Sequence, residues 1–96
     1  MKKGYWVASY RTITDPQALQ DYSAQAGPAI EAAGGKFLSR GIVIAAHEAG
    51  WVERTVIVEF ESVERAKAAY ETDAYREALA AMMDGVERDF RILEGV

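Results

Sequence analysis

The chain has 96 residues, half of them hydrophobic and about a quarter charged, which fits one globular domain over residues 1–96. It has no cysteine, which excludes disulfides and thiolate chemistry and favours a reducing, cytoplasmic location. The net charge is −4 and the basic residues are scattered, so we expect neither a nucleic-acid partner nor an anionic membrane surface. No stretch approaches the ~20 apolar residues of a membrane span.

The first third of the chain predicts a strand followed by a long helix. The segment Gly4–Arg11 is dense in aromatic and β-branched residues, as strands are. Thr14 or Asp15 can cap a helix that begins at Pro16, because the missing N–H of proline would be unpaired there anyway. One apolar stripe then runs at spacings of three and four: Leu19, Tyr22, Ala26, Ile30 and Ala33. Gly34-Gly35 ends the helix.

The middle of the chain predicts two strands joined by a turn. The second strand extends from Lys36 to about Ala46, and its glycine, Gly41, is the expected site of a bulge. Residues 47–51 form the turn, and the third strand is Arg54–Phe60, nearly continuously apolar at its centre.

The last third predicts a helix that restarts once and a closing strand. Ser62 caps the helix, and Thr72-Asp73 restarts it. The apolar stripe of the continued helix contains Tyr75, Leu79, Met82 and Val86. The closing strand is expected at Asp89–Glu94. The order β-α-β-β-α-β predicts an α+β, ferredoxin-like domain: a four-stranded antiparallel sheet with its helices on one face.

The sheet is expected to be apolar on its open face as well. If Trp6 faces the helices, then Tyr5, Val7 and Ser9 point away from them. If Val58 and Phe60 face the helices in the third strand, then Glu59 points away as well. An apolar face of this extent marks an interaction surface. The economical explanation is a homodimer whose two sheets face each other, with ~800 Å² covered on each subunit.

Several segments together resemble a bacterial family of domains of unknown function, DUF thirteen-thirty, within the dimeric α-β barrel superfamily. They are Gly4-Tyr5-Trp6, Asp15-Pro16, the stretch from Gly34 to Gly41, Val58-Glu59-Phe60 with Ser62, and Tyr70 with Tyr75. The resemblance implies a ferredoxin-like fold and a dimer whose sheets enclose a barrel-like interior. The superfamily includes cofactor-independent monooxygenases, muconolactone-isomerase-like enzymes, haem-handling proteins and ligand sensors, whereas this family has no assigned activity.

Glu59 and Arg40 are the candidate catalytic residues. A carboxylate in the middle of a central strand is costly unless it is paired, and Arg40 lies mid-strand in the neighbouring strand. Glu59 could act as acid or base while Arg40 clamps a carboxylate or enolate. The alternative is a structural ion pair that fixes register or the dimer contact.

Tyr5 and Ser9 are candidate ligand-binding residues, because their hydroxyls would line the same face as Glu59. Plain packing of the first strand is the alternative. His47 is the only histidine and is expected in an exposed turn; no metal site is expected, because ligation needs three or four donors in fixed geometry.

Two functional hypotheses remain from the sequence. In the first, the homodimer binds or converts a small organic molecule between its sheets without a cofactor, using Glu59 and Arg40. In the second, the dimer is structural or regulatory and its interior is filled.

Overall fold

Seven elements follow one another in the computed structural model, which describes all residues from 1 to 96. They are β1 (Gly4–Ile13), α1 (Pro16–Ala32), β2 (Lys36–Ile42), β3 (Arg54–Phe60), α2 (Val63–Tyr70), α3 (Asp73–Met82) and β4 (Val86–Glu94). Asp15 caps α1 by accepting from the backbone N–H of Gln17, and Ser62 caps α2. The predicted restart is confirmed: the Thr72 hydroxyl accepts from the N–H of Tyr75 and begins α3 as a separate helix.

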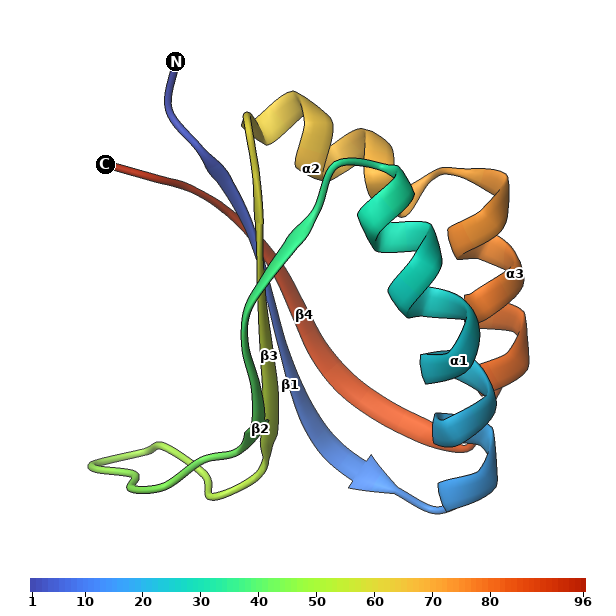
Figure 1. The fold of residues 1–96 in the computed structure, drawn as a ribbon. Helices are drawn as coiled ribbons and strands as arrows, with labels where there is room; N and C mark the ends of the chain where they lie inside the picture. The colour runs from blue at the N-terminus through green and yellow to red at the C-terminus, as the bar shows by residue number, and fades with distance from the viewer.

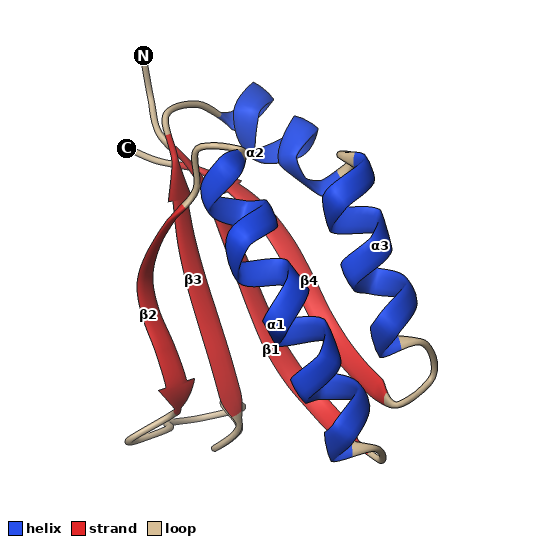
Figure 2. Ribbon diagram, turned by 45° about the vertical axis from the view of Figure 1, so that its right-hand side comes forward, coloured by secondary structure: helices blue, strands red, loops and turns tan.

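The strands form one antiparallel sheet in the order β2-β3-β1-β4, and all three helices cover the same face (Figures 1 and 2). The predicted ferredoxin-like α+β fold is therefore confirmed, with the second helix divided in two. Within one chain the sheet is open and does not close into a barrel. No helix combines the length and the apolar character that crossing a bilayer requires.

Two strand boundaries differ from the prediction. β2 ends at Ile42, about four residues early, because the chain then leaves the sheet in a loop of residues 43–53 that projects away from the helices (Figure 1). β4 begins at Val86, which was expected on the helix stripe. Met83 has a positive φ (46°), which ends α3, and Val86 then pairs with Ile13 in β4.

The core lies between the helices and the sheet and is centred on Trp6. Its indole ring lies 5.0 Å from the rings of Phe60, Tyr75 and Phe90, and its N–H donates to the carbonyl of Ala66 at 2.7 Å. The strand alternation that buries Trp6 leaves Tyr5, Val7 and Ser9 half-buried on the open face, as predicted.

Candidate functional site

Three of the predicted site residues share the open face of the sheet. Tyr5 pairs with Glu59 across β1 and β3, and Ser9 pairs with Thr55 four residues further along. The Tyr5 hydroxyl donates to Glu59 Oε2 at 3.2 Å. Desolvation of the hydroxyl, together with this bond, raises the pKa of Tyr5. Glu59 therefore has a neutral hydroxyl as its partner within the subunit, and the ligand-binding roles of all three residues remain predictions.

The predicted pair of Arg40 with Glu59 is not formed. A β-bulge between Phe37 and Ser39 inserts Leu38 into β2, so Arg40 lies opposite Val56, a residue of the helix-facing set. A one-residue shift moves every later side chain of a strand to the other face. The bulge was expected at Gly41, beyond Arg40, where it would have left Arg40 on the open face. The arginine instead stacks over the ring of Phe37 at 4.7 Å.

His47 lies in the exposed 43–53 loop, where its carbonyl accepts from the N–H of Gly50. No three side chains of His, Cys, Asp or Glu come together in a group that would hold a metal ion.

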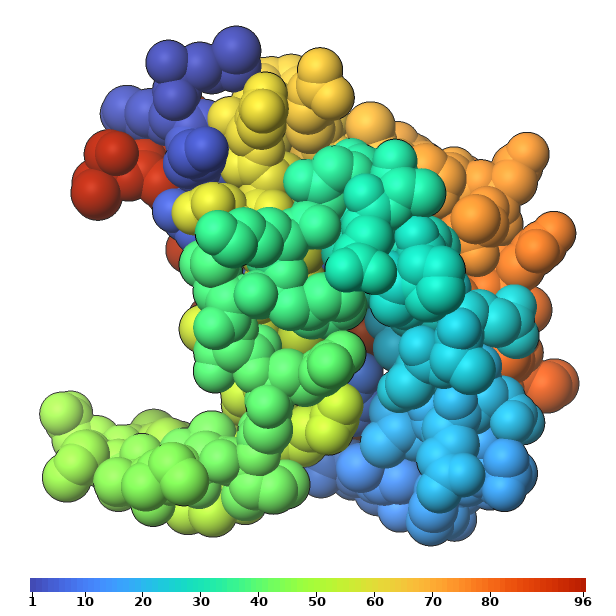
Figure 3. Space-filling view, in the orientation of Figure 1, coloured from blue at the N-terminus to red at the C-terminus, as the bar shows by residue number.

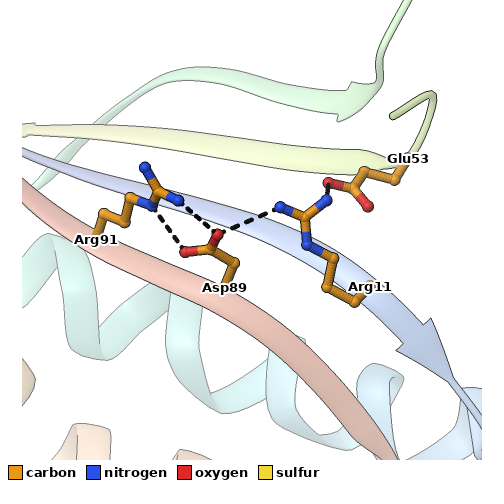
Figure 4. Close-up of polar contacts among 4 residues, drawn as sticks. All are labelled: Arg11, Glu53, Asp89 and Arg91. Carbon is orange, nitrogen blue, oxygen red and sulfur yellow. Dashed lines mark hydrogen bonds and ion pairs between the residues drawn. The ribbon is translucent and has the colours of Figure 1, made fainter. Parts of the chain in front are cut away.

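Four charged side chains, which the sequence did not predict as a group, form a row of ion pairs across the open face (Figure 4). Arg11 Nη1 lies 2.9 Å from Glu53 and its Nη2 lies 3.3 Å from Asp89, which Arg91 contacts at 2.9 Å. Hydrogen bonds from Arg91, assisted by Arg11, lower the pKa of Asp89. Arg11 also stacks on Trp51 at 4.5 Å, so this row of ion pairs connects β4 and β1 to the base of the projecting loop.

A pocket opens on the opposite face of the sheet, beneath α1. Its cavity volume is about 30 Å³, and the hollow spans about 430 Å³ when the part open to solvent is included. Figure 3 shows its mouth as a hollow between α1 and the green segment that contains β2. Ten of its fifteen lining residues are hydrophobic, and the rest include Arg40, Arg54 and Arg88. This is the concave, mostly apolar surface with few polar groups that small organic molecules occupy.

A cluster of one arginine and two tyrosines lies at one wall of this pocket, where Arg88 and Tyr22 line it and Tyr75 lies behind them. Arg88 donates to the Tyr22 hydroxyl at 3.1 Å and to the Tyr75 hydroxyl at 2.9 Å, and the two hydroxyls are 2.6 Å apart. Burial raises the pKa of Tyr22 and of Tyr75, so both remain neutral in the folded protein. Contacts with the tyrosines keep Arg88 charged, since they raise its pKa despite the burial.

Arg54 and Arg88 were not predicted as site residues, although the strand pattern around Arg54 indicates which face it occupies. Arg54 is in phase with Val56 and Val58, so strand parity places it on the helix face. Arg88 had no such signal, because the closing strand was expected to begin only at Asp89, whereas β4 begins at Val86.

The sequence comparisons place the chain in a family. The model of the domain of unknown function DUF1330 matches residues 3–96. The chain belongs to this family. The resemblance found in the sequence is thereby confirmed, and it extends over nearly the whole chain. No curated protein sequence is significantly similar to this DUF1330 domain.

Solved structures support the fold of the DUF1330 domain at low identity. A protein of unknown function from Rhodopseudomonas palustris, RPA0582, is 19% identical, with a TM-score of 0.72 over 99% of this chain and 83% of that chain. A dimeric ferredoxin-like protein from Thermobifida fusca is 15% identical, with a TM-score of 0.67 over 97% and 91%. SnoaB, a cofactor-independent oxygenase from Streptomyces nogalater, is 10% identical, with a TM-score of 0.66 over 97% and 92%.

Proposed function

We propose that this protein is a homodimer in which each subunit binds a small, partly apolar organic molecule in the pocket between α1 and the sheet. The observation that carries the proposal is the pocket itself: aromatic and aliphatic walls, a side open to solvent, and a few polar groups. The proposal moves the ligand from the space between two sheets, where the sequence hypothesis put it, to the helix side of each sheet.

The open face supports the homodimer. Val7 and Ile57 pair at its centre, and Leu93, beside Tyr5, is half-exposed. The projecting loop adds exposed Trp51 and Val52 at the end of this face. Apolar side chains in such number on a subunit of this size favour a covered surface. The structural neighbour from Thermobifida fusca is itself described as dimeric.

A purely structural dimer is the second candidate. It is favoured by the open face, where the Tyr5 hydroxyl already donates to Glu59 and four charged side chains pair with one another. The pocket of the first candidate could also convert its ligand without a cofactor. SnoaB, which has this fold, is described as a cofactor-independent oxygenase.

The two candidates are separated by blocking the pocket mouth. Ser23 lines the mouth and is exposed, whereas Ala24, also exposed, does not line it. The probes are 1-naphthoate and its neutral amide, 1-naphthamide, measured by calorimetry and by the rise in melting temperature that ligand binding produces. Binding of at least one probe that Ser23→Trp removes and Ala24→Trp preserves supports the pocket. Failure of both probes to bind, or unchanged binding to Ser23→Trp, refutes it.

A further inference from the structure

We infer that the molecule bound in this pocket carries an oxyanion, a carboxylate or a phosphate, attached to its apolar body; this inference rests on the proposed function. The observation behind it is the charge of the lining. Three guanidinium groups line the pocket, from Arg40 in β2, Arg54 in β3 and Arg88 in β4, and none of the fifteen lining residues is acidic. The chain as a whole has a net charge of −4, so the pocket is a local inversion of its charge.

None of the three arginines has an acidic partner in the subunit. Arg88 is held by two neutral tyrosine hydroxyls, and Arg40 contacts the face of Phe37. The Nε of Arg54 is buried and has no hydrogen-bond acceptor, while its guanidinium lies 5.7 Å from the ring of Tyr10. A buried donor without an acceptor is costly, and native structures leave few of them.

The other face of the sheet provides the internal comparison. There, Arg11 lies between two carboxylates, Glu53 and Asp89, and Arg91 pairs with Asp89. Glu53 immediately precedes Arg54 in the sequence, but its carboxylate contacts Arg11 on the opposite face. The arginines of the open face are thus paired with carboxylates, whereas the arginines of the pocket are not.

The arrangement of the three cations suits an oxyanion bound at one end of an apolar ligand. The guanidiniums of Arg54 and Arg88 both lie over the ring of Tyr10, at 5.7 and 5.8 Å. Guanidinium forks match the oxygens of carboxylates and phosphates and remain charged at any physiological pH. The remaining walls, including Ile30, Phe37 and Val58, are apolar and would hold the body of the ligand.

The test compares three probes with one ring system: 1-naphthoate, 1-naphthyl phosphate and neutral 1-naphthamide. We expect at least one anion to bind about tenfold or more tightly than the amide, since charge-assisted hydrogen bonds differ from neutral ones by about this factor. We also expect its binding to weaken with salt and to shift the Arg54 Nε–H signal in a ¹⁵N NMR spectrum. Which anion binds more tightly distinguishes a carboxylate from a phosphate ligand.

Variants locate the effect. Arg54→Met and, because Arg40 is exposed and safer to replace, Arg40→Met should each lower anion affinity about tenfold and leave amide affinity unchanged. Arg76→Met, on the exposed side of α3, is the matched control and should change neither. Equal binding of all three probes in the pocket overturns the anion inference and leaves the proposed function standing. Absence of any binding refutes the proposed function itself.

Discussion

Removal of one buried hydroxyl, by Tyr75→Phe, tests how the wall of the pocket is held together. Tyr75 is completely buried, and its ring packs against Trp6 and Tyr70, contacts that phenylalanine preserves. Its hydroxyl accepts from Arg88 at 2.9 Å and lies 2.6 Å from the Tyr22 hydroxyl. A neutral hydrogen bond contributes ~1 kcal/mol and one to a charged group ~1.5–3 kcal/mol. Because Arg88 still donates to the Tyr22 hydroxyl in this variant, we expect a loss of about 2–3 kcal/mol in the free energy of unfolding.

The assay is urea denaturation followed by circular dichroism, at one protein concentration because an oligomer's stability depends on it. Tyr70→Phe is the matched control: its ring belongs to the same aromatic cluster, but its hydroxyl takes no part in the bonding around Arg88. The control should change the free energy by less than ~0.5 kcal/mol. Equal effects of the two substitutions would refute the structural role assigned to the Arg88 cluster.

Three further predictions concern the dimer, the core and the row of ion pairs on the open face. Val7→Asp on the open face should convert the dimer to monomer in sedimentation velocity, whereas Ala80→Glu on the exposed side of α3 should not. Gly35→Ala should lower the free energy of unfolding by ~1–3 kcal/mol, since its Cβ would lie 2.5 Å from a side-chain carbon of α1; an unchanged urea midpoint would contradict this close packing. Asp89 should titrate below its ordinary pKa in ¹³C NMR, and Arg91→Gln should raise that pKa. The stabilisation from Asp89 is therefore present above the unfolded-state pKa and is lost as the pH falls through the lower folded-state value.

The alternation of side chains along the strands gave the most accurate predictions of which residues share a face. It correctly placed Tyr5, Ser9 and Glu59 on one face, because alternation needs only the assumptions that Trp6 is buried in the first strand and Val58 in the third. It failed for Arg40, because the bulge after Phe37 has no glycine or proline to signal it, and one inserted residue reverses the facing of everything beyond it.

The pocket could not be predicted from the sequence. It depends on how α1 lies over the sheet, and on Tyr22 and Tyr75, 53 residues apart, meeting at Arg88. Helix periodicity indicates which residues face the sheet, but not which of them meet across two helices. The boundary of β4 mattered equally, because Arg88 is one of the three residues, Val86 to Arg88, that were expected to precede the strand.

A crystal structure of the protein soaked with 1-naphthoate would show where an organic anion binds. We expect density between α1 and the sheet, with the carboxylate beside Arg54 and the ring against the apolar wall. Density between two facing sheets, beside Tyr5 and Glu59, with an unchanged pocket would contradict this expectation.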